Sequence, residues 1–302
     1  MDDGPQESVP VSPPVTRFAP SPTGWLHLGH IFSALVATRL GEGYLLRIDD
    51  IDHTRCRPAF ADQLMDDLQF LGLAWKGEPV FQSQRLNHYA AALDRLRQMG
   101  LVYPCYLTRA ELANVLSAPH GGPTDIARSG PTATDSALAE DEVARRAEAG
   151  VEPAWRLRTE KAMEMAGDIG WTDLRQGKVQ PVAMAAHGDV VVARRDIGTS
   201  YHLSVVIDDM MDGATLVTRG TDLEDSTHVH RLLQAVLGIP APAYFHHDLV
   251  HDESGKRLAK RHDALSVAEM RKNGLSATEI LSQLPSFADF AKIRRDYYCF
   301  TN

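Results

Sequence analysis

The segment VTRFAPSPTGWLHLGHIFSALVATRLGEGYLLRI, residues 15–48, decides the fold of this 302-residue chain. Its first five residues, 15–19, predict a buried strand, and the turn-forming residues at 20–24 predict a tight connection. Apolar residues at helical spacing predict a helix over 26–40, ended by Gly41 and Gly43, and residues 44–48 predict a second strand. A strand, turn, helix and strand in this order begin a parallel, doubly wound sheet, so we expect an α/β fold.

The remaining chain continues the alternation. Amphipathic helices are expected around 60–71 and 86–100, strands at 190–193, 203–207 and 216–218, and a helix at 223–237. Capping boxes at Ser266 with Glu269 and Ser276 with Glu279 predict two short consecutive helices. We therefore expect a disordered leader at 1–14, a Rossmann-like catalytic domain at 15–103 and 187–245, an inserted α+β subdomain at 104–186, and a short helical C-terminal region within 246–302.

Composition limits the classes of function. The formal net charge of -9 argues against a generally basic nucleic-acid binder, so any RNA contact must be local. Basic residues cluster at Arg194–Arg195 and at 256–261, although such runs are usually solvated faces. The three cysteines lie far apart and no apolar run is long enough for a membrane span, which favours a cytoplasmic protein with reduced thiols and no membrane partner. A monomer is the default expectation.

The N-terminal end of the first helix is a candidate phosphate site. A helix that directly follows a strand offers free backbone N–H groups and the positive end of its dipole. Gly29 allows close approach of a flat base, and His27 and His30, three residues apart on one helical face, can donate to phosphate oxygens. In isolation, a histidine pair at this spacing is more often a surface or core feature.

The whole string changes that interpretation. Pro20-Ser-Pro-Thr-Gly-Trp-Leu-His-Leu-Gly-His30 resembles the HIGH signature of class I aminoacyl-tRNA synthetases, in the form of the glutamyl and glutaminyl branch. Lys256-Arg-Leu-Ala-Lys-Arg261 resembles the second signature, KMSKS, with Arg257 and Lys260 for its two lysines and Ala259 for the usual serine. The resemblance implies His27, His30 and Lys260 as catalytic residues, and an ATP site formed by Pro20, Thr23, Gly24, His27, Gly29, His30, Arg257, Leu258 and Lys260.

A glutamate pocket needs fixed positive charge, because an unpaired buried carboxylate is costly. The resemblance assigns Arg17, Tyr201 and Arg219 to this pocket, together with Phe18, Ala19, Pro20, Ser21 and Asp49. Asp49 aligns with a family glutamate that receives the substrate ammonium, and its shorter side chain changes the reach. The alternatives are structural: an ion pair for Arg17, a core ring for Tyr201, a surface strand for Arg219, and a capped turn or a metal site for Asp49, Asp50 and Asp52.

Two features favour the glutamyl-Q members of this branch. Val205 stands where ordinary bacterial glutamyl-tRNA synthetases typically have asparagine, and only 41 residues follow Arg261, too few for an anticodon-reading domain. The resemblance implies activation of L-glutamate by ATP with Mg²⁺, and transfer of the glutamyl group to queuosine in the anticodon loop of tRNA(Asp). The alternatives are a truncated synthetase that charges a tRNA 3′ end and a non-catalytic paralogue that binds adenylate or RNA.

The zinc site of the inserted, acceptor-type subdomain is expected to be lost. Many glutamyl-Q enzymes hold zinc through a Cys-x-Cys pair with later Tyr and Cys ligands, but here Leu107 follows Cys105 and the next cysteine is Cys299. Structural zinc needs four donors. We therefore expect no zinc, with Cys105 and His120 as an open alternative for a partial remnant.

Overall fold

The computed structural model describes residues 12–108, 110–111, 137–250, 266–285 and 290–301. The expected leader lies outside this part as far as residue 11, and so do His120 and the whole of the second signature, with Arg257, Leu258 and Lys260. Within the described ranges, no helix is both long and apolar enough to cross a membrane.

The N-terminal third forms the β/α unit that its sequence predicts. A parallel sheet has the order β1 (Arg17–Phe18), β2 (Leu45–Ile48), β3 (Lys76–Phe81), and the connections run through α1 (Leu28–Gly41) and α2 (Pro58–Phe70). Gly41 ends α1 against the sheet, and a Cβ there would overlap Thr16 Oγ1. The close packing of α1 on β1 therefore depends on this glycine.

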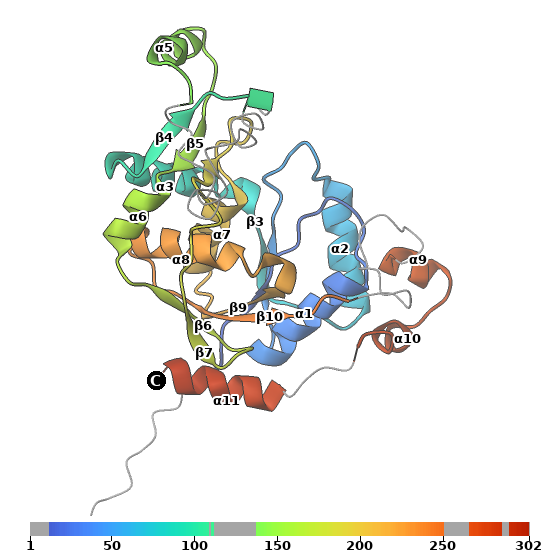
Figure 1. Cartoon of the computed structure of the whole chain (residues 1–302). Helices are drawn as coiled ribbons and strands as arrows, with labels where there is room; N and C mark the ends of the chain where they lie inside the picture. Colours follow the sequence, from blue (N-terminus) through green and yellow to red (C-terminus); the bar gives the residue numbers. More distant parts are fainter. Residues whose placement is uncertain (1–11, 109, 112–136, 251–265, 286–289, 302) are drawn as a thin grey trace, which may run out of the picture.

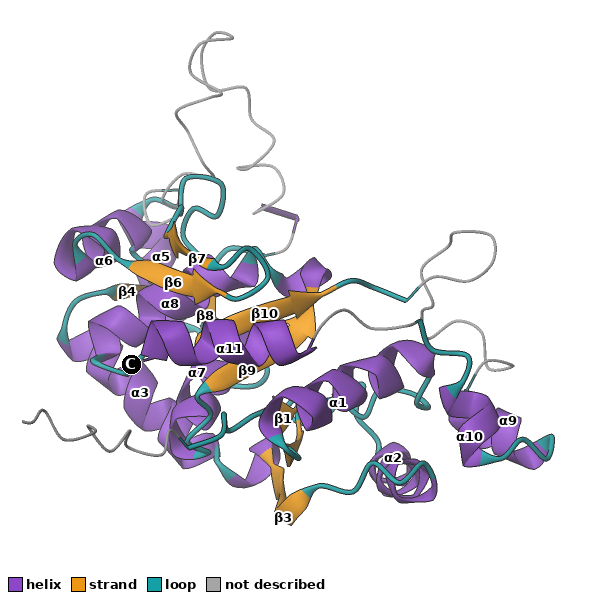
Figure 2. Cartoon of the chain, turned by 90° about the horizontal axis from the view of Figure 1, so that it is seen from below, coloured by secondary structure: helices purple, strands orange, loops and turns teal. Residues whose placement is uncertain are grey.

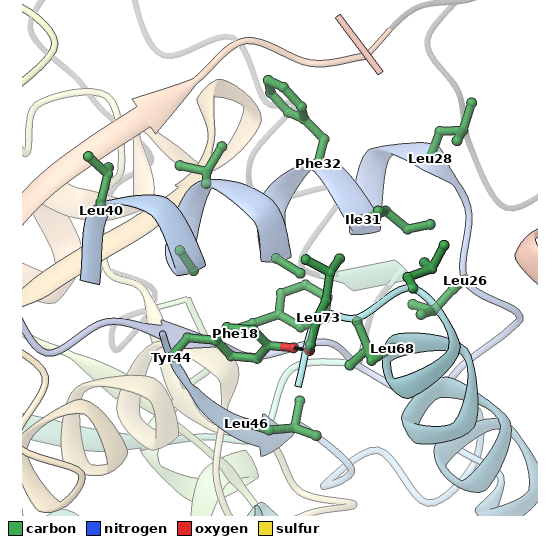
Figure 3. Close-up of a cluster of buried hydrophobic side chains, with 14 of the residues drawn as sticks. Phe18, Leu26, Leu28, Ile31, Phe32, Leu40, Tyr44, Leu46, Leu68 and Leu73 are labelled. Carbon is green, nitrogen blue, oxygen red and sulfur yellow. Dashed lines mark hydrogen bonds between the residues drawn. The ribbon is translucent and has the colours of Figure 1, made fainter. Parts of the chain in front are cut away.

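A hydrophobic core lies beneath α1 (Figure 3). Ile31 and Leu40 are fully buried on its inner face, over Leu46 of β2 and Leu68 of α2. Tyr44 crosses this core and its hydroxyl donates to the carbonyl of Leu73. The core thus fixes α1 over the sheet, and with it the position of the loop that precedes the helix.

A second sheet continues from the first in the order β9 (Leu216–Gly220), β10 (Ala243–His247), β6 (Gly170–Asp173), β7 (Lys178–Pro181). Only β7 is antiparallel. The carbonyl of Val15 joins the two sheets by accepting from the backbone N–H groups of Thr215 and Leu216, at 3.0 and 3.1 Å.

Helices cover both faces of this second sheet. Ala243 and Phe245 face the core under α1, whereas Tyr244 between them points the other way, to Gln234 of α8 (Ser226–Leu237) at 3.0 Å. Strand residues alternate between the faces of a sheet. The predicted Rossmann-like, doubly wound α/β fold is therefore confirmed (Figure 1).

A smaller antiparallel sheet has the order β4 (Val102–Cys105), β5 (Ala154–Leu157), β8 (Val191–Ala193). The helices α3 (Leu86–Gln98), α5 (Glu140–Glu148) and α6 (Thr159–Ala166) precede and follow its strands along the chain. The expected subdomain at 104–186 also contains β6 and β7, which pair with the catalytic sheet through β10. The division into domains remains a prediction.

One predicted element is wrong. Residues 203–207, expected as a strand, belong to the helix α7 (Tyr201–Met211). The Ser200 side chain caps it by accepting from the N–H of Leu203, and Leu203, Val206 and Ile207 pack at helical spacing into the core shared with α3 and α8. A short apolar run does not distinguish a buried strand from a buried helix.

The described part of the C-terminal region contains the two short consecutive helices that the residues at 266 and 276 predict. It comprises α9 (Val267–Lys272), α10 (Ala277–Leu281) and α11 (Phe290–Thr301). Ser266 and Ser276 both cap their helices, each accepting from the N–H three residues on. In α11, Arg294 donates to the carbonyl of Arg39 at 2.6 Å, which holds this helix alongside α1 (Figure 2).

Candidate active site

A cavity of about 770 Å³ opens at the carboxyl ends of β1, β2, β9 and β10. This edge of a doubly wound sheet is where ligands bind. All eight residues predicted for glutamate line it: Arg17, Phe18, Ala19, Pro20, Ser21, Asp49, Tyr201 and Arg219. Of the residues predicted for ATP, Pro20, His27, Gly29 and His30 line it, whereas Thr23 and Gly24 do not.

The two predicted catalytic histidines meet at the start of α1. His27 is the N-cap residue in extended conformation, so it precedes the helix instead of lying on its face as expected. Its ring accepts from the N–H of Gly29 at 3.1 Å, the His30 ring accepts from the N–H of His27 at 3.3 Å, and the two rings stack with centroids 3.8 Å apart. The two rings thus cap the first turn of α1 where it borders the cavity.

Gly29 has a second role that its sequence did not reveal. A Cβ at this position would lie 3.0 Å from Cε1 and 3.1 Å from Nδ1 of the His27 ring. Such contacts are tighter than ordinary van der Waals packing. The glycine therefore makes room for the capping imidazole as well as for a ligand.

The second signature is outside the described residues, but the chain on either side of it is at this cavity. Val250 lines the cavity, and Ser266 forms a β-bridge with His27. The N–H of Val267 also donates to the carbonyl of Leu26 at 2.8 Å. The described residues on either side of 251–265 thus lie at the wall of the cavity and at the N-terminal end of α1.

Beneath one side of the cavity lies a buried network of ion pairs. Asp209 of α7 accepts from Arg17 Nε at 3.0 Å and from Arg47 Nη1 at 2.7 Å, and Arg47 Nε donates to Asp49 at 2.8 Å. Arg85 joins the same network through Asp208 and Asp212, at 2.9 and 2.7 Å. Three arginines therefore face four aspartates, which leaves one carboxylate in excess.

Burial disfavours the ionised form of Asp49 in this network. Burial raises its pKa to about 6, although Arg47 acts in the opposite direction. Burial alone would also raise the pKa of Asp209, but Arg17 and Arg47 outweigh it and lower this pKa. Asp49 lines the cavity, so the excess negative charge is available to a bound cation.

Arg219 of β9 differs from the ion-paired arginines of this network, because its contacts are with uncharged groups. It is 5% exposed, and its nitrogen atoms contact His246 at 3.2 Å, His230 at 3.0 Å, Thr227 Oγ1 at 2.6 Å and the Tyr201 hydroxyl at 3.5 Å. Within the described part of the chain, no carboxylate pairs with it. A buried guanidinium without an anion is costly, so this wall of the cavity favours a bound anion.

Several residues of this site have no recognisable motif in the sequence. They are Arg47, which lines the cavity and centres the ion-pair network, and His230 and His246, which contact Arg219. Their contacts join distant parts of the chain, and residue spacing carries no signal of them. Val205 was singled out and lines the cavity, from α7 and not from the expected strand.

Comparison with known proteins adds independent findings. The family model for the catalytic domain of class I tRNA synthetases (E and Q) matches residues 14–284. The glutamyl-Q tRNA(Asp) synthetase of Rhodobacter capsulatus is 45% identical over 281 residues, which are 88% of this chain and 98% of that protein. The protein of the same name from Nitratidesulfovibrio vulgaris is 39% identical over 284 residues, covering 90% and 85%.

Among solved structures, a glutamate tRNA ligase from Elizabethkingia meningosepticum superimposes with a TM-score of 0.65 at 26% identity. The match covers 87% of this chain and 53% of that ligase. The chain thus spans about half of the ligase and nearly all of the Rhodobacter protein.

Proposed function

The chain belongs to the catalytic-domain family of class I tRNA synthetases for glutamate and glutamine, and from this premise we propose that it activates L-glutamate with ATP and transfers the glutamyl group to queuosine in tRNA(Asp). It is a ligase of the aminoacyl-tRNA synthetase type. Its first product is glutamyl-adenylate, with pyrophosphate as the leaving group. ATP enters with Mg²⁺ as a substrate complex.

The observation that carries the proposal is the charge pattern of the cavity. One wall offers Arg219, with which no carboxylate of the described residues pairs, and another offers Asp49 from a network with one carboxylate in excess. Since β1 lies between β2 and β9, the ends of these two strands are roughly 10 Å apart. An amino acid with an ammonium at one end and a side-chain carboxylate at the other satisfies both walls at once.

Arg17 completes the proposed pocket. Its Nε and Nη2 donate to Asp209 and its Nη1 donates to the carbonyl of Thr218 at 3.1 Å, which leaves two of its five N–H groups without a partner among the described residues. These contacts fix the plane of the guanidinium. Arg17 is thus a pre-oriented donor whose charge is already balanced.

The activation step needs no nucleophile from the protein. The α-carboxylate of glutamate attacks the α-phosphorus of ATP, the bond to the bridging oxygen breaks, and pyrophosphate departs with the negative charge. His27, His30 and the backbone at the start of α1 orient the phosphates, and such positioning supplies about 7–11 kcal/mol in favourable cases. Lys260 remains a predicted partner of the leaving pyrophosphate, as Arg257 and Leu258 remain predicted ATP contacts.

The choice of acceptor follows from the relatives. The relatives that are 45% and 39% identical over 88% and 90% of this chain are both named glutamyl-Q tRNA(Asp) synthetases. These findings favour the tRNA(Asp) acceptor over a tRNA 3′ end. The cavity with an unbalanced arginine disfavours a paralogue without an amino-acid substrate.

Two assays test the proposal. Glutamate-dependent exchange of pyrophosphate into ATP is expected without any tRNA, and its absence removes the proposed activation. Labelled glutamate is then offered to three forms of tRNA(Asp): with queuosine, with the unmodified guanosine, and with queuosine but without the terminal adenosine. Transfer to the first and third forms alone is expected. Transfer that needs the terminal adenosine would instead identify a synthetase that charges the 3′ end.

A further inference from the structure

The partners of Arg219 share one property: each is neutral. Arginine has five N–H donors and no acceptor, so every atom it contacts must accept. His230 therefore accepts through Nδ1, and His246 accepts through Nε2. Thr227 Oγ1 accepts from Nη2 at 2.6 Å and lies 3.1 Å from His246 Nε2.

This geometry fixes the proton on each ring. With Nδ1 as an acceptor, the proton of neutral His230 is on Nε2, where it faces His202 Nδ1 at 3.1 Å. With Nε2 as an acceptor, the proton of His246 is on Nδ1, which is buried without a partner in the described structure. Burial and the nearby Arg219 lower the pKa of His230 far below its ordinary value, and the pKa of His246 to about 3. Both rings are thus neutral near pH 7.

We infer that His230 and His246 are positioning residues that hold Arg219 through neutral acceptors and so keep its positive charge for the side-chain carboxylate of the substrate. On this inference, which rests on the proposed function, the two histidines set the preference for glutamate over glutamine. A carboxylate in place of either ring would still orient the guanidinium but would balance its charge.

Arg17 in the same cavity provides the comparison. Asp209 holds it through two contacts, at 3.0 and 3.3 Å, and the carbonyl of Thr218 adds a third at 3.1 Å, so its orientation is fixed and its charge is balanced. Arg219 receives as many orienting contacts, from two rings and a hydroxyl, with no added negative charge. The two arginines therefore differ in the charge of their acceptors and not in the number of contacts. Because the acceptors of Arg219 are uncharged, its positive charge favours a charged ligand over a neutral one.

The matched pair His230→Asp and His230→Asn tests this inference. Both variants place an acceptor near the position of Nδ1 and both lose the contact with His202. Their side chains have nearly the same shape, but only Asp carries a negative charge. His228→Asp is the control for a new carboxylate on α8, because His228 contacts the N–H of Ala183 and does not line the cavity. The readouts are KM for glutamate, KM for ATP and the ratio of kcat/KM for glutamate to that for glutamine in pyrophosphate exchange.

His230→Asp is expected to raise KM for glutamate about 30-fold or more and to lower the glutamate-to-glutamine ratio by a similar factor. KM for ATP should stay within about twofold, and His230→Asn and His228→Asp should keep the preference for glutamate. An unchanged ratio in His230→Asp, or an equal loss in His230→Asn, overturns the inference. Absence of exchange by the wild-type protein instead overturns the proposed function.

A measurement on the wild-type protein covers the case in which the Asp variant does not fold. Nitrogen-15 spectra of the histidines at pH 7 should show neutral rings, with the proton on Nε2 of His230 and on Nδ1 of His246. An imidazolium signal from either ring overturns the inference, since a protonated ring cannot accept from Arg219.

Discussion

Protonation of Asp49 should weaken glutamate binding as the pH falls below neutrality. Burial raises the pKa of this carboxyl to about 6, and in the proposed complex only its ionised form holds the substrate ammonium. At pH 7.5 nearly all of it is ionised, whereas at pH 5 about one molecule in ten carries the charge. The value of kcat/KM for glutamate should therefore fall about tenfold between these pH values.

The same raised pKa affects stability in the opposite direction: the contribution of Asp49 to the free energy of unfolding increases as the pH falls. The pKa of an unfolded aspartate is near 3.8, so the folded state of this group binds a proton more readily than the unfolded state. Its contribution to stability is present below pH 3.8 and is lost as the pH rises through 6. A shift of about two units corresponds to about 3 kcal/mol at neutral pH, because Asp49 is almost fully buried.

The assays separate these two effects with one variant. Pyrophosphate exchange is measured from pH 5 to 8 at varied glutamate and at varied ATP, for the wild type and for Asp49→Asn. The substrate side chain, with an ordinary pKa near 4.3, stays mostly ionised over this range. Urea unfolding of both proteins should show that the wild type gains stability relative to Asp49→Asn as the pH falls.

A glutamate KM that is flat from pH 7.5 to 5 in the wild type, with the same profile in Asp49→Asn, would refute the reasoning. So would an equal pH dependence of the ATP KM, because the effect would then belong to the phosphate side of the cavity. If the wild type instead loses stability relative to Asp49→Asn as the pH falls, the pKa of Asp49 is lowered in the folded protein.

Three further substitutions test other parts of the structure. Asp209→Asn leaves the buried Arg17 and Arg47 without their shared carboxylate and should lower the free energy of unfolding by about 3–5 kcal/mol. An unchanged midpoint in urea denaturation would contradict the ion-pair network. Gly29→Ala pushes the His27 ring from its capping position, so kcat should fall and the KM for ATP should rise while the KM for glutamate is unchanged. A rise in the KM for glutamate alone would count against the proposed phosphate site. Gly41→Ala forces a methyl group onto Thr16 and should lower stability by about 1–3 kcal/mol in thermal unfolding, with activity per folded molecule retained; an unaffected melting temperature would mean that α1 can shift on the sheet.

The sequence predicted the parts of the fold in which local signals agree. In residues 15–48 the apolar spacing, the turn residues and the terminal glycines all indicate the same strand and helix, and the structure has them within two residues. Residues 203–207 gave an ambiguous signal, since five mostly apolar residues fit a buried strand or a buried helix equally well. The cap at Ser200 separates the two, because a serine that accepts from the N–H three residues on marks the start of a helix.

The candidate site was predictable as far as residues carry recognisable motifs. The eight residues assigned to glutamate by resemblance all line one cavity. The layer beneath them was not predictable, because Arg17 meets Asp209 across 192 positions and Arg219 meets His246 across 27. Such pairs are formed by the order of strands in the sheet, and that order is a property of the assembled fold.

The two arginines of the cavity, Arg17 and Arg219, show that the buried residues around a motif side chain determine its electrostatic effect on a ligand. A guanidinium is always charged near neutral pH, so the only way a protein can vary its effect is through what surrounds it. Asp209 turns Arg17 into an oriented but electrically balanced donor, whereas His230 and His246 orient Arg219 and leave its charge intact. Uncharged acceptors around Arg219 lower the stability of the unliganded protein, because they leave a buried cation without an anion among the described residues. A substrate carboxylate that enters the cavity pairs with Arg219 and removes this destabilisation. A glutamine side chain has the same shape but no charge, so it cannot do so.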